Sequence, residues 1–416
     1  MKILFVHHNM PGQYREMIQW LAEQKQHELV FLTQKDPPPK IKGVTTVRYK
    51  AHHKAEDKAY GLSKVWEDAT GYGYGAARAM RKLKLEHNYT PDIILGHTGW
   101  GELLFTKDVW PDVPVIGFFE YFYNNEGGLV GFDPEKPPSE ESDFLNRARN
   151  VVPLSSFDSV DLGVVPTHWQ KNTYPSYFHK KFYCCHDGIR TDLLTPDPDV
   201  EISLGRVDRP LTRDDEVFTF MARNLERARG FHVLMRALPQ IQAERPNARL
   251  LIIGGNGTSY GKKSTHPRGL RGEMEEELGT RVDWSRVHFL GKVPYETYQK
   301  VIQISRCHLY LTMPFVLSWS CIEAMSMGAT MVATDVAPVR EAISHGKTGL
   351  LIDFHDPGHL AKQVVEVLAN PDEYAHLGVA ARKHVIKHYD FLTRCLPMHI
   401  NRINSLVKTG AKISLP

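Results

Sequence analysis

The stretch "CHLYLTMPFVLSWSCIEAMSMGATMVATD", residues 307–335, contains a strand, a loop, a helix and a second strand in one piece. "CHLYLT" and "TMVATD" are short and almost continuously apolar, which favours strands covered on both faces, as in a parallel sheet. "CIEAMSMG" between them predicts a helix that Gly328 closes. Strand, helix and parallel strand form the unit of doubly wound α/β domains. One carboxylate, Glu323, stands inside this otherwise apolar helix, and a buried carboxylate is costly unless a polar group meets it.

The same alternation extends along the whole chain. Short apolar runs in the first half include "KILFVHH", "ELVFLT", "DIILGH", "PVIGFF" and "LGVVPT", and in the second half "VFTFMA", "RLLIIGG", "VHFLGK" and "TGLLID". A chain of 416 residues is too long for one typical core. We therefore expect two doubly wound α/β domains, residues 1–195 and 196–390, with a C-terminal helix in 390–416 that can pack back on the first. Ligands of such sheets bind beyond the carboxyl ends of the strands.

Composition excludes several classes of protein. A hydrophobic content of 42% with 24% charged residues is typical of a globular chain, and a net charge of +3 is too small to indicate a nucleic-acid partner. The five cysteines show no CxxC spacing, which favours reduced thiols in the cytoplasm. The first apolar run, Ile3 to Val6, is too short for a signal peptide, and no run approaches the ~18 residues of a membrane span. Peripheral attachment to the inner face of a membrane stays open.

An arginine cluster follows one of the predicted strands. In "FMARNLERARGFHVLMRAL" the strand is expected to end at Met221, and Arg223, Arg227 and Arg229 come before a helix that starts near Gly230. Cations beside helix N-terminal amides suit a polyanion, and the arginine fork matches phosphate oxygens. The alternative is a solvated basic loop without a ligand.

The loop "MPFVLSWS" leads into the helix that contains Glu323. We expect the backbone amides of Trp319 and Ser320 to face an anion at the helix N-terminus. Glu323 is placed in the first helical turn, where the alternative interpretation is a carboxylate that interacts only with its own helix end.

Two further loops carry candidate residues at strand ends. His97 follows a strand directly in "DIILGHTGWGE", and Gly12 and Gln13 lie in "NMPGQYREM". A lone histidine is more often structural than functional, and neither "GQYR" nor "GGNG" is a GxGxxG fingerprint. The chain also lacks GxxxxGK[ST], HExxH and GxSxG. Asp197-Pro198-Asp199 is spelled like a metal-binding DxD, but it lies in the expected linker and is interpreted as a turn, so no metal is expected.

Taken in order, these segments resemble family 4 of the retaining nucleotide-sugar glycosyltransferases, which have the GT-B fold. The resemblance covers almost all of the second half, through "MARNLERARGFHVLMRAL", "RLLIIGGNG", "VHFLGKVPYETY" and "FVLSWSCIEAMSMGATMVATD". The first half is similar to one subgroup through "PDIILGHTGWGELLF", "FFEYFY" and "GFDPE". No single motif is specific, but their collinear order is.

The resemblance implies roles for matching positions. Arg223 and Arg229 match a pair that holds the donor pyrophosphate, and Glu323 matches a glutamate that accepts hydrogen bonds from the ribose. His97 matches a histidine near the transferred sugar, and Gly12 and Gln13 match a loop that approaches the donor phosphates or the acceptor. Further substrate-binding positions are expected at Gly254, Gly291, Val293, Phe315, Leu317, Ser318, Trp319 and Ser320. Phe315 departs from the family, which has a sugar-binding glutamate there, so backbone amides of Leu317 to Ser320 are expected to contribute more.

The expected function is a retaining, metal-independent and cofactor-free transfer of a hexose from a nucleoside-diphosphate sugar to an unidentified acceptor hydroxyl. The family context implies cell-surface polysaccharide or glycoconjugate biosynthesis. Arginines and helix amides would stabilise the departing diphosphate, so no general base is required. The loop "EYFYNNEGGLVGFDPEKPP" is expected either on the acceptor side or as a structural excursion. Two alternatives remain open, a GT-B nucleotide-sugar epimerase and a non-catalytic nucleotide-sugar-binding partner, whereas a dinucleotide-dependent dehydrogenase is disfavoured by the missing fingerprint.

Overall fold

The chain folds into two compact units. The computed structural model describes residues 1–205, 207–260, 263–408 and 410–416. The first unit comprises Met1–Gly131, Lys136–Gly188 and Asp390–Pro416, and the second comprises Phe132–Glu135 and Ile189–Tyr389. The C-terminal segment thus belongs to the first unit, and a short piece of the N-terminal half belongs to the second.

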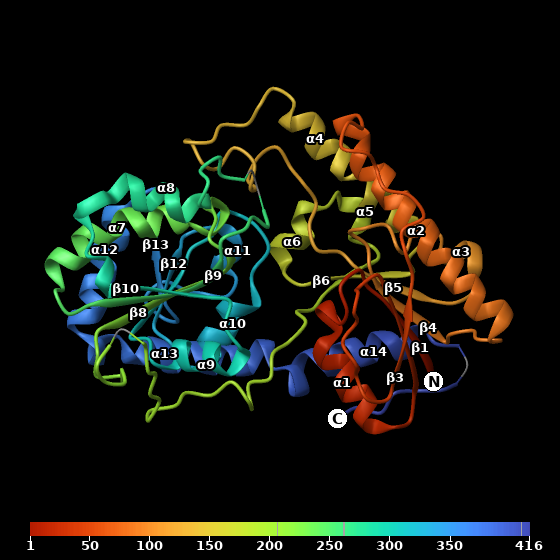
Figure 1. Cartoon of the computed structure of the whole chain (residues 1–416). Coiled ribbons are helices and arrows are strands. Elements are labelled where there is room, and N and C mark those ends of the chain that lie inside the picture. Colours follow the sequence, from red (N-terminus) through yellow and green to blue (C-terminus); the bar gives the residue numbers. More distant parts are fainter. Residues whose placement is uncertain (206, 261–262, 409) are drawn as a thin grey trace. The chain divides into compact units, whose positions relative to one another are not determined.

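The first unit is built on a seven-stranded parallel sheet in the order β3-β2-β1-β4-β5-β6-β7 (Figure 1). Its strands are β1 (Lys2–Val6), β2 (Glu28–Thr33), β3 (Val44–Arg48), β4 (Ile93–His97), β5 (Val115–Phe118), β6 (Leu162–Val165) and β7 (Phe182–Cys184). In register, Phe5 of β1 lies between Phe31 of β2 and Leu95 of β4. The strand order reverses beside β1, which places the ends of β1 and β4 at a topological switch point.

Helices cover both faces of this sheet. The helical segments are η1 (Gly12–Tyr14), α1 (Arg15–Gln24), α2 (Gly61–Glu86), α3 (Thr106–Val109), α4 (Ser142–Arg149), α5 (Val151–Asp158), α6 (His168–Thr173), η2 (Ser176–Phe178), η6 (Phe391–Cys395) and α14 (Leu396–Leu406). Side chains of α1 and α14 pack with Phe5 in one core, and side chains of α2 pack with Leu4 in the other. Successive side chains of β1 therefore lie in the cores on opposite faces of the sheet, which explains the unbroken apolar run of this strand.

The second unit has a six-stranded parallel sheet in the order β10-β9-β8-β11-β12-β13. Its strands are β8 (Val217–Asn224), β9 (Arg249–Gly255), β10 (Val287–Gly291), β11 (Cys307–Tyr310), β12 (Met331–Thr334) and β13 (Leu350–Ile352). Strand β8 continues past the expected end at Met221, so Arg223 lies within the strand and not after it. Pairing of Asn224 with Gly255 of β9, beyond an irregularity in register, extends the strand.

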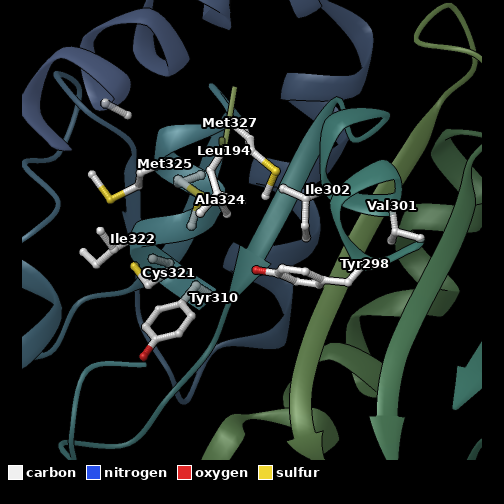
Figure 2. Close-up of a cluster of buried hydrophobic side chains, with 14 of the residues drawn as sticks. Leu194, Tyr298, Val301, Ile302, Tyr310, Cys321, Ile322, Ala324, Met325 and Met327 are labelled. Atoms are coloured by element: carbon white, nitrogen blue, oxygen red, sulfur yellow. The ribbon is translucent and has the colours of Figure 1, made fainter. Parts of the chain in front are cut away.

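The helical segments of the second unit are η3 (Arg227–Arg229), α7 (Phe231–Glu244), α8 (Gly269–Leu278), η4 (Gly279–Arg281), η5 (Trp284–Arg286), α9 (Tyr295–Gln303), α10 (Trp319–Ser326), α11 (Ala337–Arg340), α12 (Pro357–Ala369) and α13 (Pro371–Tyr389). Figure 2 shows how the apolar side chains of α10 meet those of α9 in the core, with the Tyr298 hydroxyl directed towards α10. This packing buries the helix that the opening stretch predicted, and Glu323 with it.

The stretch between the first sheet and β8 contributes to the second core. Ile189, Leu194, Val200, Ile202 and Leu211 are buried there, and Ile202 and Leu211 form an antiparallel bridge. Asp197 forms a turn, since its Oδ1 accepts a hydrogen bond from the Asp199 N–H at 3.0 Å. Among the described residues, no helix has the length and apolar character needed to cross a membrane.

Candidate donor and acceptor sites

Arg229 is placed by the turn between η3 and α7. Gly230 has φ +65°, and a Cβ at this position would come within 2.4 Å of the Leu311 Cβ. Only glycine adopts this left-handed conformation so close to a neighbouring strand end without strain. The turn directs the preceding side chain inwards, and Arg229 is only 8% exposed.

The partners of Arg229 are all neutral. Its Nη1 donates to Thr312 Oγ1 at 2.9 Å and makes longer contacts of 3.4 Å with Tyr310 Oη and Val316 O. Among the residues that the structure describes, none forms an ion pair with it. A buried cation without a direct ion pair is costly, because its lost hydration is only partly replaced by neutral dipoles and by the longer-range attraction of the Glu226 carboxyl. The surroundings of Arg229 therefore suit an anionic ligand.

Aromatic rings flank the Arg229 guanidinium. Its carbon lies 5.3 Å from the ring centroid of Tyr260 and 6.0 Å from that of Phe315, and the two rings are 4.7 Å apart. Ring faces at this range attract a guanidinium. Phe315 is 5% exposed, so it belongs to the wall that confines the cation.

The other two arginines of the cluster differ from Arg229. Arg223 is exposed and has no ion pair within the described part of the chain. Arg227 instead binds Asp133, Glu135 and Glu273 at 3.1–3.4 Å. Arg223 and Arg229, which form no direct ion pair among the described residues, are therefore the two that match the family's pyrophosphate-binding pair. Arg223 is solvated, although it lies in β8 and not in a loop, whereas the solvated interpretation is wrong for the buried Arg229.

Glu226 organises the loop beside these arginines and was missed by sequence analysis. Its Oε2 accepts hydrogen bonds from the backbone N–H groups of Ser259 at 3.1 Å and Tyr260 at 2.8 Å. Burial raises the pKa of the Glu226 carboxyl, while those two amides and the charges of Arg229 and Arg223 act in the opposite direction. The carboxylate thus holds Tyr260 in place against the guanidinium.

The N-terminus of α10 is capped by its own sequence. Ser318 Oγ accepts from the Ser320 N–H, and the Ser318 N–H donates to Tyr310 Oη at 2.8 Å. The Ser320 amide, which was expected to face an anion, is thus used by the helix cap. Trp319 is the first residue of α10, and the Leu317 side chain lies in the apolar core. Tyr310 Oη contacts both Ser318 and Arg229, so the cap and the buried cation share one partner.

Glu323 is the fifth residue of α10, beyond the first turn. Its carboxylate is 5% exposed and accepts hydrogen bonds from Tyr295 Oη at Oε1 and from Tyr298 Oη at Oε2, both at 2.8 Å. The prediction of a first-turn position and the helix-end alternative are wrong, because the side chain faces α9. Neither tyrosine was singled out from the sequence, although both lie in "VPYETY", 28 and 25 positions before Glu323.

The remaining positions of the second unit line the strand ends. Gly254 lies in β9, where a Cβ would come within 2.8 Å of the Ala222 carbonyl oxygen. Gly291 ends β10 with open space where a side chain would stand, and Val293 packs partly buried on the core.

His97 ends β4 in the first unit. Its Nδ1 accepts a hydrogen bond from the Gly99 N–H at 2.9 Å, so in the neutral ring the proton resides on Nε2. Among the described residues the buried Nε2 has no hydrogen-bond partner, and Glu120 Oε2 lies 3.7 Å from it. Trp100 stacks on the ring at 4.2 Å. A buried and oriented N–H without an acceptor is rare in a native structure and points to a ligand.

His7 brings the Gly12–Gln13 loop to the same strand ends. Its Nδ1 accepts from the Asn9 N–H, and its Nε2 bonds to Gln13 Oε1 at 2.5 Å. Burial lowers the pKa of His7 to about 3, helped by the neighbouring ring of His97, so the imidazole is neutral. Gly12 has φ +55°, and a Cβ there would lie 2.4 Å from the His7 ring. The neutral ring therefore fixes the Gln13 amide with its NH₂ group directed away.

A second histidine on this edge has a carboxylate partner that its sequence neighbourhood does not reveal. His8 Nδ1 lies 2.9 Å from Glu102 Oε1, which also accepts from Tyr49 Oη at 2.6 Å. His53 similarly meets Glu67 at 2.5 Å. The pairing of His8 with Glu102 is not visible in the sequence, because β1 and the loop after β4 are adjacent only in the folded sheet.

One group in the second unit has the composition of a metal site. Ligand atoms of Asp133, Glu135 and His232 lie within 4.8 Å of one another. Arg227 binds both carboxylates and Arg236 also binds Glu135, and these side chains lower the pKa of Glu135 to about 2. Two guanidinium groups already neutralise these carboxylates, which opposes the addition of a further cation.

Comparison with known proteins agrees with this arrangement. Residues 25–194 match the family described as Glycosyl transferase family 4 group, and residues 207–384 match Glycosyl transferases group 1. Together the two matches span most of both units. The chain belongs to the family 4 glycosyltransferases.

Curated relatives of this family 4 glycosyltransferase include a D-inositol 3-phosphate glycosyltransferase of Corynebacterium diphtheriae. It is 24% identical over 292 residues, which cover 70% of this chain and 64% of the relative. A GDP-mannose-dependent α-(1-6)-phosphatidylinositol monomannoside mannosyltransferase of Mycolicibacterium smegmatis is 26% identical over 50% of this chain and 52% of the relative. The chain therefore spans less than two thirds of the length of these relatives.

Solved structures confirm the expected fold class. Sucrose-phosphate synthase from Thermosynechococcus elongatus superposes with a TM-score of 0.70 at 17% identity, covering 96% of this chain and 97% of that chain. Anabaena HepE in complex with UDP-glucose gives a TM-score of 0.66 at 14% identity, covering 97% and 99%. Two parallel, doubly wound sheets with this likeness define the GT-B fold of the family 4 glycosyltransferase.

Proposed function

We propose that the protein transfers a hexosyl group from a nucleoside-diphosphate sugar to an acceptor hydroxyl, with retention of configuration and without a metal ion. The observation that carries this proposal is the buried Arg229 guanidinium, which is held by neutral partners and lacks an ion pair within the described residues. The exposed Arg223 lies nearby in the chain, at the end of β8. A diphosphate supplies the negative charge that this pair lacks.

The chemistry follows from where charge develops. Cleavage of the bond between the sugar anomeric carbon and the phosphate oxygen leaves a nucleoside diphosphate with additional negative charge. Arg229 is already oriented and desolvated, so it stabilises that charge with little reorganisation. The acceptor oxygen forms the new bond on the face from which the diphosphate departs, and the acceptor proton passes to the departing phosphate oxygen. No protein base is required in this scheme.

Residues of the first unit act on the sugar and the acceptor in this proposal. The unpartnered Nε2–H of His97 donates to a hydroxyl oxygen of the transferred sugar. The Gln13 amide, fixed by His7, offers its NH₂ group to a donor phosphate or to the acceptor. Glu323 in the second unit accepts hydrogen bonds from the ribose hydroxyls.

The relatives' names motivate the biological setting. One name contains D-inositol 3-phosphate, and the other contains phosphatidylinositol monomannoside and states a dependence on GDP-mannose. By analogy, we place the protein in cell-surface polysaccharide or glycoconjugate biosynthesis, acting in the cytoplasm or at the inner face of the membrane.

The decisive experiment is a ligand panel followed by turnover. Nucleoside diphosphates and their sugars should raise the melting temperature, because a ligand that binds only the native state stabilises it, whereas the free nucleosides should raise it much less. Release of nucleoside diphosphate from the stabilising donor should continue in excess EDTA. Loss of turnover on chelation that Mn²⁺ or Mg²⁺ restores would overturn metal independence. Equal stabilisation by nucleoside and nucleoside diphosphate would overturn the diphosphate site.

A further inference from the structure

The proposed role of Glu323 raises a problem of access. Each Glu323 oxygen accepts from a tyrosine hydroxyl and could accept a second donor, but Glu323 is only 5% exposed, so a ribose hydroxyl cannot reach it past the side chains that cover it. Some group must move before a nucleotide can bind there. The two tyrosines differ strongly in their freedom to do so.

Tyr298 is held in the core. It is 5% exposed, and Figure 2 shows its ring among the apolar side chains of α9 and α10. Burial raises the pKa of its hydroxyl well above 10, and the adjacent Glu323 charge acts in the same direction, so it remains a proton donor to the carboxylate. Displacing this ring would open a cavity the size of an aromatic side chain, which costs several kcal/mol.

Tyr295 is far more exposed to solvent than Tyr298. It is the first residue of α9 and is 45% exposed, although its hydroxyl lies 2.8 Å from Glu323 Oε1. Its ring lies 5.5 Å from that of Tyr298. A side chain on the first turn of a helix, with almost half of its surface in water, can change rotamer without disturbing the core.

We propose that Tyr298 is a positioning residue that fixes the Glu323 carboxylate, and that the Tyr295 hydroxyl occupies the ribose subsite until a nucleotide ribose replaces it. This inference rests on the proposed function, since it deepens the role assigned to Glu323. It explains how a buried carboxylate can remain satisfied in the ligand-free protein and still be available to a ligand.

The exchange makes binding conditional on the ribose diol. A ribonucleotide replaces the lost tyrosine bond with a hydroxyl of its own, so the carboxylate is paired before and after binding. A nucleotide without 2′ and 3′ hydroxyls cannot replace it, and Tyr295 then remains on Glu323. Removing the tyrosine hydroxyl removes the competitor, so affinity for ribonucleotides should increase and affinity for the dideoxy analogue should not change.

The test uses the full chain and isothermal titration with UDP, GDP and ADP, followed by the 2′,3′-dideoxy analogue of whichever binds. Tyr295→Phe should bind the ribonucleotide roughly three- to tenfold more tightly than wild type, the factor that corresponds to one net hydrogen bond. Tyr298→Phe should bind it more weakly. Tyr374→Phe is the matched control, because the Tyr374 hydroxyl is also influenced by a carboxylate, that of Glu366, in the same unit. It should behave as wild type.

Two outcomes would overturn the inference. One is unchanged or weaker ribonucleotide binding by Tyr295→Phe, and the other is an equal gain for the dideoxy analogue. If Tyr298→Phe does not fold, Tyr295→Phe decides alone.

Glu323→Gln separates this inference from the proposed function. Loss of the ribose preference in Glu323→Gln, with no gain in Tyr295→Phe, leaves the ribose role standing and refutes the displacement. An unchanged ribose preference in Glu323→Gln refutes the ribose role itself.

Discussion

Replacing Arg229 by methionine should separate stability from binding. Methionine has a similar length and no charge, so Arg229→Met removes a buried cation while leaving most of the packing. The substitution removes one hydrogen bond of ordinary length, from Arg229 Nη1 to Thr312 Oγ1 at 2.9 Å, and two long contacts of 3.4 Å. One such bond contributes about 1 kcal/mol, while the desolvation of an unpaired ion costs several kcal/mol.

The free energy of unfolding of ligand-free Arg229→Met should therefore be unchanged or up to about 2 kcal/mol higher than that of wild type. Binding of nucleoside diphosphate should weaken by about 1.5–3 kcal/mol, the range for hydrogen bonds to charged groups, which is roughly 10- to 150-fold in Kd. Binding of the unphosphorylated nucleoside should not change. Thermal or urea unfolding measures the first quantity, and isothermal titration measures the others.

Arg227→Met is the matched control within the same cluster. Arg227 is paired with Asp133, Glu135 and Glu273, so its loss leaves carboxylates without partners and should lower stability with little effect on nucleotide binding. If Arg229→Met were destabilised like Arg227→Met and bound nucleoside and nucleoside diphosphate equally poorly, Arg229 would be a structural cation and the reasoning would be refuted.

Three further predictions follow from other residues. Burial lowers the pKa of His7 to about 3 and the pKa values of His186 and His399 to about 4, so the unfolded chain, in which these pKa values are near 6.5, binds more protons than the folded chain. The melting temperature should therefore be highest above pH 6.5 and should fall as the pH decreases towards 4. A melting temperature that does not change over this range would contradict the prediction. Gly12→Ala forces φ +55° on a residue whose Cβ meets the His7 ring, so it should lower the free energy of unfolding by about 1–3 kcal/mol in denaturant, whereas Gly346→Ala, which also has a positive φ but open space around it, should lower it less. His97→Ala should lower turnover about tenfold with unchanged affinity for nucleoside diphosphate, and weakened diphosphate binding would place His97 elsewhere.

The fold was largely predictable because its signals are local. Short, unbroken apolar runs indicate strands buried on both faces, and "CIEAMSMG" between two of them indicates a crossover helix. The structure confirms both parallel sheets and the helix α10. Boundaries were less accurate: β8 extends through Arg223 because pairing with β9 continues past an irregularity in register that apolarity alone does not reveal.

The sequence by itself determined the two Rossmann-like sheets, the collinear motifs of the family and the choice of Arg223, Arg229, His97 and Glu323 as candidates. Only the tertiary structure decided how each candidate is satisfied. Burial without a direct ion pair among the described residues distinguishes Arg229 from Arg227, although the two stand two positions apart. Glu323 meets Tyr295 and Tyr298 because α9 packs against α10, and His8 meets Glu102 because β1 and β4 are neighbours in the sheet. Charge, hydration and hydrogen bonding depend on distances between atoms far apart along the chain, and a residue's identity does not contain those distances.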